Sequence, residues 1–177
     1  MEENVNLVYL ARYVKPTGVD GDILLGDLAA AIPSLPVGSS LHMGYSVNFT
    51  TPYRVENWHS DGRRATVKLF GIDSPETAEN FGEFGVFIER SLLERLYPDL
   101  MLTDEILELT AYDAVTGERL GSITDVWLMP ANDVWTLELG EEKIPLPVIE
   151  DVIVRIDRKR KSVFVNLMEG LRELAYK

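Results

Sequence analysis

The chain has 177 residues, of which 46% are hydrophobic, enough for one core of ordinary size or two small ones. It has no cysteine, which excludes disulfides, thiolate nucleophiles and thiolate metal ligands. The formal net charge of −12 excludes the basic footprint of an autonomous nucleic-acid-binding protein and favours a basic protein partner.

No apolar run approaches the length of roughly 20 residues that a membrane-spanning helix needs. The chain opens Met1-Glu2-Glu3, which is acidic and is not typical of a secretory signal. We therefore expect a cytoplasmic protein without a membrane partner.

The first half predicts short β-strands separated by turns. Segments rich in β-branched, aromatic and aliphatic residues are typical of strands, and they fall at 5–14, 23–28, 40–45, 52–59, 65–72 and 82–89. Gly18 and Gly21 mark one turn, and residues 60–64 another. One helix is predicted to start at Pro75, because Ser74 can cap it and Glu76 suits its positive end.

A domain boundary is predicted where the alternation of apolar and polar residues is lost. Residues 90–105 read as a short helix followed by a linker that contains Pro98. We expect an N-terminal domain at 1–96, a linker at 97–104 and a C-terminal domain at 105–177.

The second half again predicts strands. They fall at 106–113, 119–129, 134–139, 152–157 and 162–166, and residues 169–177 could form one or two helical turns. Residues 141–145 read as a solvated turn. In the strand at 119–129 the core candidates are Leu120, Ile123, Val126 and Leu128, and Gly121 suits a bulge or a close backbone approach. Many short strands separated by turns predict an all-β fold of barrels or sandwiches with short helices.

Asn132 and Asp133 directly precede an alternating strand, so they could be a catalytic pair, metal ligands or a hairpin turn. Asn and Asp favour turns because their side chains bond nearby backbone groups. A catalytic or metal role would need histidines or carboxylates at a recognisable spacing, and none is near. The hairpin interpretation is favoured.

No other motif supports catalysis or a bound cofactor. His42 and His59 stand outside any zinc-binding pattern, and Asp20 and Asp22 lack the rest of a calcium loop. There is no phosphate-binding glycine loop and no nucleophile elbow. We expect no metal, no cofactor and no enzyme, although an enzyme built from scattered carboxylates stays open as an alternative.

Positive charge concentrates in one place, the run Arg158, Lys159, Arg160 and Lys161, with Arg155 shortly before it. A solvated hairpin tip is the simpler interpretation, and contact with RNA phosphates is the functional one. Arg12, Lys15 and residues 63–64 raise the same question more weakly.

Two tryptophans, Trp127 and Trp135, flank the Asn132 turn. Core packing is the default for both, since each falls in a strand. One of them could instead be an exposed anchor, because tryptophan is enriched in binding hot spots.

The order of these motifs resembles the RimM family of ribosome maturation factors over nearly the full length. The segment "YVKPTGVDGDILL" and the later "GIDSPETAENFGEFGVFI" match the first half of that family, and "GERLGSITDVWLMPANDVWTLEL" and "IPLPVIEDVIVRIDRKRKSVFVNLMEGL" match its second half. Each motif alone is weak, but four in order are specific. Two departures stand out: Asp20 replaces a residue that is often basic, and residues 101–113 lack the family's aromatic signature.

The resemblance implies two β-barrel domains, a translation-factor-like N-terminal barrel and a PRC-type C-terminal barrel. It implies an assembly factor that acts as a monomeric chaperone of ribosome biogenesis. Such a protein binds the head of the immature small (30S) subunit, contacts ribosomal protein nineteen of the small subunit, and assists assembly and processing of the 3′ domain of 16S rRNA. The alternative is a PRC-barrel interaction module for a non-ribosomal protein partner.

The predicted binding residues lie in the second domain. They rest on exposure of the hairpin and on the family's use of this domain, and they are Trp127, Met129, Asn132, Asp133, Trp135, Arg158, Lys159, Arg160 and Lys161.

Overall fold

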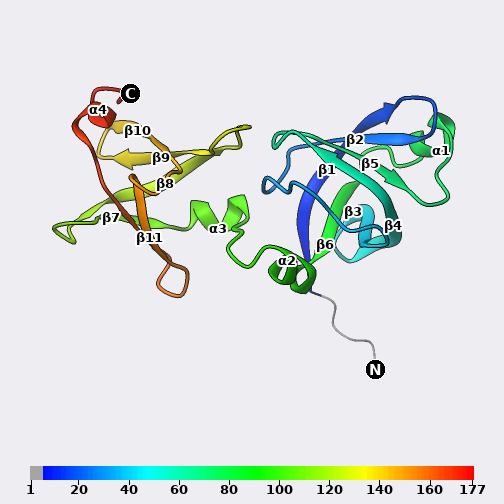
Figure 1. The fold of residues 1–177 in the computed structure, drawn as a ribbon, viewed down its shortest axis with the longest axis horizontal. Coiled ribbons are helices and arrows are strands. Elements are labelled where there is room, and N and C mark those ends of the chain that lie inside the picture. The colour runs from blue at the N-terminus through cyan, green and yellow to red at the C-terminus, as the bar shows by residue number, and fades with distance from the viewer. Residues whose placement is uncertain (1–5) are drawn as a thin grey trace. The chain divides into compact units, whose positions relative to one another are not determined.

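The structure is a computed structural model that describes residues 6–177 (Figure 1). The chain forms two compact units, one that ends at Leu100 and one that begins at Met101. Each unit has its own buried apolar side chains, so each is described by itself. Among the described residues, no helix is long and apolar enough to cross a membrane.

Six antiparallel strands close into a barrel in the first unit. Their order is β1-β2-β5-β4-β3-β6, and β1 also pairs with β6. The bounds are β1 Leu7–Thr17, β2 Asp22–Gly26, β3 Ser40–Ser46, β4 Phe49–Ser60, β5 Ala65–Leu69 and β6 Gly85–Glu89. The six predicted strands are confirmed, although Val5, the first residue of the first prediction, lies outside the described residues. Closure leaves this sheet without an unpaired edge.

Alternation along the strands builds the core of the barrel. On β5, Ala65, Val67 and Leu69 are buried, whereas the side chains between them are partly exposed. Ile23 and Leu25 of β2 are fully buried in the same way. Each buried valine, leucine or isoleucine side chain contributes about 1.5–3 kcal/mol relative to leaving it in water.

Two short helices accompany the barrel, α1 at Pro75–Glu79 and α2 at Arg90–Leu96. The predicted start of α1 is confirmed. The Ser74 hydroxyl accepts a hydrogen bond from the Thr77 amide at 3.3 Å, and the Thr77 hydroxyl accepts one from the Ser74 amide at 3.2 Å. These two bonds satisfy amide groups that the first turn of a helix leaves without an intrahelical partner.

The second unit is a six-stranded sheet of order β10-β9-β8-β7-β12-β11, in which β7 and β12 are parallel. Its elements are α3 Thr103–Leu107, β7 Thr110–Asp113, β8 Arg119–Trp127, β9 Val134–Leu139, β10 Glu142–Pro147, β11 Ile153–Asp157, β12 Ser162–Val165 and α4 Glu169–Arg172. Every strand contributes apolar side chains to one core, so the sheet curves around that core. The predicted all-β class with short helices is confirmed.

The prediction of a strand over 106–113 is wrong in its first part. Ile106 and Leu107 belong to α3, and only Thr110–Asp113 is strand. The Glu105 carboxylate accepts the Leu102 amide at 2.8 Å, and acidic residues in the first turn of α3 suit its positive end. A short apolar run does not by itself separate helix from strand.

The prediction of a solvated turn at 141–145 is right only for Glu141, because β10 begins at Glu142. Lys143 of β10 exchanges backbone hydrogen bonds with Tyr176, on the side away from β9. Pro145 and Pro147 share that orientation, since backbone groups alternate along a strand. The nitrogens of both prolines therefore face away from β9, and their lack of an N–H group removes no hydrogen bond between β10 and β9.

The four core candidates of β8 are only partly confirmed. Ile123 is buried, Leu120 and Val126 pack against the core, and Leu128 lies beyond the strand and outside the core cluster. In a regular strand, residues 123 and 126 would face opposite sides. A register shift between Ile123 and Asp125 turns both toward the core.

The predicted close backbone approach at Gly121 is confirmed. A Cβ atom at this position would lie 1.8 Å from the Glu138 carbonyl oxygen of the neighbouring strand. Only glycine fits here without moving the β8 or β9 backbone.

Candidate binding surfaces

The turn between β8 and β9 contains Asn132 and Asp133, so their hairpin interpretation is confirmed. An Asp133 carboxylate oxygen accepts the Met129 amide at 3.2 Å, which ties the two ends of the turn together. Residues 6–177 contain no group of three or more histidines and carboxylates arranged to hold a metal ion.

Burial separates the two tryptophans that flank this turn. Trp127 is 49% exposed, and its indole N–H donates to an Asp125 carboxylate oxygen at 2.6 Å. Met129 beside it is 39% exposed. These two side chains give the turn an apolar surface.

Trp135, one of the predicted binding residues, does not lie on the surface. It is 3% exposed and belongs to the core cluster, because it sits at the inward-facing position opposite Val126. Among the described residues its indole N–H has no hydrogen-bond partner. Trp135 supports the turn from beneath instead of meeting a partner.

Burial raises the pKa of Asp133, and the Met129 amide opposes this shift only in part. The folded state therefore retains a proton that the unfolded state releases at lower pH. The resulting stabilisation is present below the unfolded pKa of about 3.9 and is lost as pH rises through the folded pKa.

We expect Asp133→Asn to remove this pH dependence while keeping an acceptor for the Met129 amide. Relative to the parent, the variant should gain stability between pH 3 and pH 7 in urea unfolding. Asp151→Asn, at an exposed position of the same unit, is the control. A stability difference that stays constant or shrinks toward pH 7 would contradict the role of burial.

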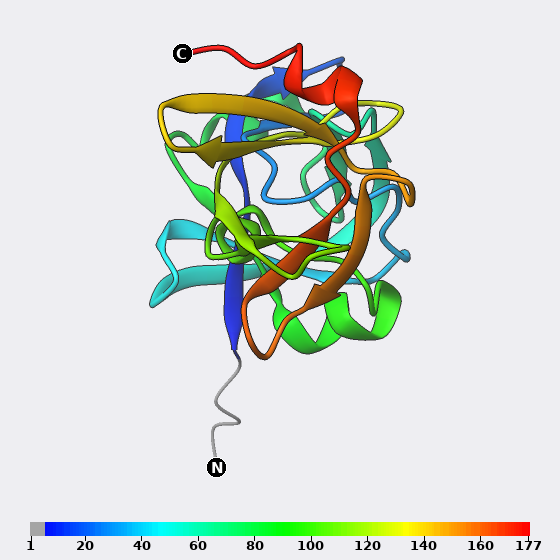
Figure 2. The same ribbon diagram turned by 90° about the vertical axis from the view of Figure 1, so that its left-hand side faces the viewer.

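The basic run forms the hairpin between β11 and β12 (Figure 2). All four of its side chains are exposed. An Asp157 carboxylate oxygen accepts the Arg160 amide at 3.0 Å and shapes the turn. Lys161 pairs with Glu108 at 2.6 Å, and the Arg160 guanidinium lies 3.9 Å from Asp157. The run is on the surface, as both the solvated and the RNA-binding interpretations require.

The predicted binding residues form two groups. In the sheet order, strand β7 lies between the β8–β9 pair and the β11–β12 pair, and Figure 1 shows the two connecting turns well apart. The first group is apolar with a partly buried carboxylate, and the second is cationic. They are suited to different partners.

The weaker basic candidates of the first unit come together around one hollow of about 680 Å³. Arg12, Lys15, Arg63 and Arg64 line it together with Asp27 and Asp61. Arg12 is paired with Asp27 at 2.8 Å. The backbone amides of Arg64 and Arg63 donate to Asp61 and lower its pKa. Positive charge exceeds negative charge in the hollow.

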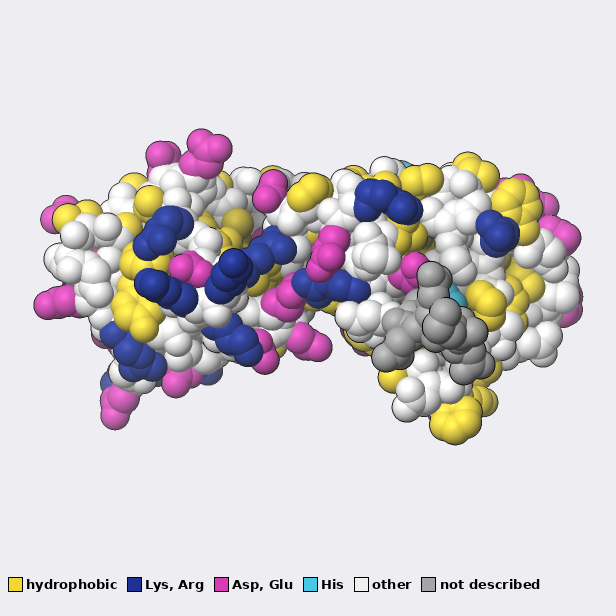
Figure 3. Space-filling model, turned by 90° about the horizontal axis from the view of Figure 1, so that it is seen from below, with side chains coloured by type: hydrophobic (Ala, Val, Ile, Leu, Met, Phe, Trp, Pro, Cys, Tyr) yellow, Lys and Arg dark blue, Asp and Glu magenta, His cyan; other side chains and the backbone are white. Residues whose placement is uncertain are grey.

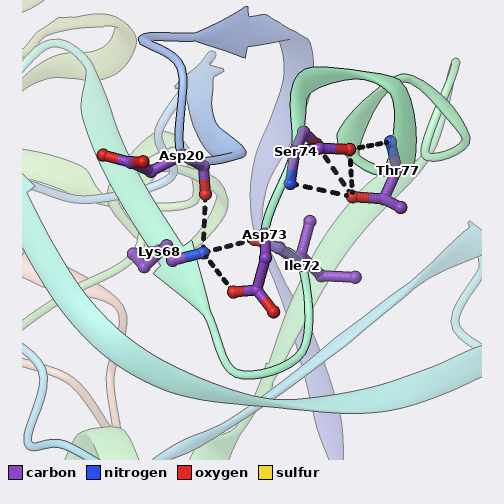
Figure 4. Close-up of polar contacts among 6 residues, drawn as sticks. All are labelled: Asp20, Lys68, Ile72, Asp73, Ser74 and Thr77. Atoms are coloured by element: carbon purple, nitrogen blue, oxygen red, sulfur yellow. Dashed lines mark hydrogen bonds and ion pairs between the residues drawn. The ribbon is translucent and has the colours of Figure 1, made fainter.

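Lys68 of β5 joins the turn at Gly18–Asp22 to the segment that precedes α1 (Figure 4). Its ammonium group donates to the Asp20 carbonyl at 2.6 Å, to the Ile72 carbonyl, and to an Asp73 carboxylate oxygen at 2.9 Å. A Cβ atom on Gly21 would lie 2.6 Å from the Ile72 carbonyl oxygen, so the two segments touch backbone to backbone. The three hydrogen bonds of the Lys68 ammonium group hold these two segments together, so the role of Lys68 is structural.

Comparison with known proteins places both units in one family. Residues 98–172 match the PRC-barrel domain. The ribosome maturation factor RimM of Lactobacillus helveticus is 39% identical over 93% of this chain and 96% of its own length. That of Lactobacillus johnsonii is 31% identical over 93% of this chain and 95% of its own length.

The chain belongs to the RimM family. A solved 16S ribosomal RNA processing protein RimM from Pseudomonas aeruginosa is 19% identical, covers 93% of this chain and 99% of its own, and has a TM-score of 0.41. The two RimM-like motifs of the first unit, which contain Gly21 and Asp73, are the segments that Lys68 and the close approach at Gly21 hold together. In this chain those motifs build the barrel wall.

Two aromatic residues that the sequence patterns do not single out lie on the outer face of β7 and β12. Tyr112 and Phe164 stack there, and Arg155 lies over the Phe164 ring. The parallel pairing of β7 with β12 joins segments about fifty residues apart in the chain, and strand patterns alone do not reveal it. Alternation within "SVFV" shows that Phe164 faces outward once the strand is known.

Proposed function

We propose that this RimM-family chain is a ribosome maturation factor of the small subunit. It binds the head of the immature 30S subunit, contacts ribosomal protein nineteen, and assists assembly and processing of the 3′ domain of 16S rRNA. The observation that carries the proposal is the match, over both units, to relatives named ribosome maturation factor RimM. The role is binding in the cytoplasm by a monomer, without a cofactor or a catalytic step.

The charge distribution supports two kinds of contact. The acidic chain, with net charge −12, attracts a basic ribosomal protein and gains encounter rate and selectivity from that attraction. Trp127 and Met129 supply apolar area for this contact, Asp133 holds their turn, and Asn132 is exposed in the same turn. The exposed hairpin Arg158–Lys161 supplies the contact with RNA phosphates.

The alternative, a PRC-barrel module for a non-ribosomal partner, accounts for the second unit alone. The relatives match over 93% of the chain, so the first unit belongs to the same function in our proposal.

Replacing Arg158, Lys159, Arg160 and Lys161 with serine is expected to weaken binding to precursor small subunits. Cations that neutralise RNA phosphates release condensed counterions, so their removal also flattens the dependence of affinity on salt. The logarithmic slope should fall by about 0.7–0.9 for each phosphate that the variant no longer neutralises. Binding measured across a salt series, from about 50 to 200 mM, checks both effects.

The control is Lys143→Ser with Lys177→Ser, two exposed cations of the same unit outside the hairpin. If the hairpin acts through local contacts, the control keeps the parent salt slope. An unchanged slope in the four-serine variant would remove the hairpin from the interface.

A further inference from the structure

A row of four side chains crosses neighbouring strands of the second unit. Arg155 of β11 is in register with Phe164 of β12, Phe164 with Tyr112 of β7, and Tyr112 with Arg119 of β8. The order across the sheet is arginine, aromatic, aromatic, arginine. We call these four residues the arginine–aromatic row.

The row lies on the outer face of the sheet. Val163 and Val165 on either side of Phe164 are buried in the core, as is Ala111 beside Tyr112. Because side chains alternate along a strand, Phe164 and Tyr112 point away from that core. Both rings are partly exposed, and Arg155 and Arg119 are exposed.

Contacts within the row hold its flat groups in place. The Arg155 guanidinium carbon lies 3.9 Å from the centre of the Phe164 ring. The Phe164 and Tyr112 rings are stacked, with centres 5.7 Å apart and planes 27° apart. Neighbouring rings lose little freedom when a flat ligand adds to such an array, because they are already ordered.

Positive charge gathers at the same face. Residues 101–177 contain nine lysines and arginines, and six of them are Arg119, Arg155 and the four of the hairpin at 158–161. The hairpin tip at Lys161 is three residues from Phe164, or about 10 Å along a strand. Figure 3 shows Lys and Arg side chains of the second unit grouped around hydrophobic ones.

We propose that the outer face of β7, β11 and β12 binds single-stranded RNA. Unpaired bases stack on the Arg155 guanidinium and on the Tyr112 ring, the Phe164 ring between them orders both groups, and Arg119 and the hairpin hold the phosphates. Aromatic rings and guanidinium planes are the groups on which proteins stack unpaired bases, and a basic groove follows the backbone. The choice of RNA as the polyanion rests on the proposed function.

An acidic peptide would use the same cations but not the aromatic rings, since carboxylates pair with charge and need no stacking surface. Arg155→Lys keeps the charge and removes the plane, but the plane also suits a carboxylate, so this variant weakens both ligands. The two ligands are told apart by Phe164→Leu, which keeps the charge and the apolar bulk and removes the ring.

The experiment is fluorescence anisotropy of the full chain with labelled oligouridine of roughly ten nucleotides, a length within the usual footprint of single-strand binders. Duplex RNA of the same length and a polyglutamate peptide serve as the other probes. Arg155→Lys should weaken oligouridine binding about tenfold, since one stacked base contributes about that factor. Phe164→Leu should weaken it about as much, because Arg155 and Tyr112 then lose the ring that orders them. Phe70→Leu, at a half-exposed aromatic of the first unit, is the matched control and should bind as the parent does.

Equal oligouridine affinity in the parent, Arg155→Lys and Phe164→Leu overturns the proposal. Polyglutamate binding tighter than oligouridine, and unaffected by Phe164→Leu, assigns the face to an acidic protein instead. Tighter binding of duplex than of single strand also contradicts stacking.

Failure here is distinguishable from failure of the proposed function. If the parent sediments with precursor subunits but does not bind oligouridine, the maturation role stands and the stacking face falls. If it binds oligouridine through the row but no precursor, the face stands and the maturation role falls.

Discussion

Replacing Gly121 with alanine is expected to unfold the second unit. The added Cβ would meet the Glu138 carbonyl oxygen at 1.8 Å and the carbonyl carbon at 2.9 Å, both backbone atoms of β9. A backbone contact cannot be relieved by a rotamer change, so β8 and β9 must separate. Because Ile123 and Leu137 of these strands are buried in the core, separation also opens that core. We expect a loss of at least about 3 kcal/mol in the free energy of unfolding.

Urea unfolding followed by tryptophan fluorescence measures this loss, since Trp127 and Trp135 lie in the second unit and Trp58 in the first. Gly170→Ala is the matched control, because a Cβ there meets nothing within 4 Å. It lies in α4, where alanine favours the helix over glycine by about 0.5–1 kcal/mol. A Gly121→Ala protein as stable as the parent would contradict the described approach of the strands.

Replacing Lys68 with methionine is expected to destabilise the first unit by about 2 kcal/mol. Methionine keeps most of the stem but loses the three hydrogen bonds to Asp20, Ile72 and Asp73. The Lys68 side chain is only 13% exposed, and water replaces it poorly at the part-buried Ile72 carbonyl. The loss should appear in urea unfolding as an earlier transition of the Trp58 signal.

Asp73→Ala tests whether the ion pair alone accounts for this effect. The Asp73 side chain is 78% exposed, and exposed ion pairs contribute about 0–1 kcal/mol. We expect Asp73→Ala to cost clearly less than Lys68→Met. Equal losses would show that the bonds to the two backbone carbonyls add nothing.

The strands and turns were largely predictable because their signals are local. Alternation within "ATVKL" places Ala65, Val67 and Leu69 in the core, and Ser74 followed by Pro75 predicts the helix start. The β10 strand was not predictable by the same rules, since its two prolines argue against a strand. They are tolerated because their backbone nitrogens face away from β9, which only the pairing reveals.

The turns of the candidate site were predictable from the sequence, but the exposure of the side chains around them was not. Asn132, Asp133 and the basic run at 158–161 were recognised as hairpin tips from residue type alone. The register shift in β8 decides which of its side chains face the core, and Trp135 of β9 lies opposite one of these, Val126. The sequence alone therefore did not separate exposed Trp127 from buried Trp135. The arginine–aromatic row depends on the parallel β7–β12 pairing, a contact between distant segments.

The measurement that tests the proposed function most directly is co-sedimentation of the purified protein with precursor small subunits, mature small subunits and complete ribosomes. We predict preferential association with the precursor, weakened by the four-serine hairpin variant and retained by Lys143→Ser with Lys177→Ser. A folded protein that associates with none of these particles, or equally with all three, would contradict a role in small-subunit maturation.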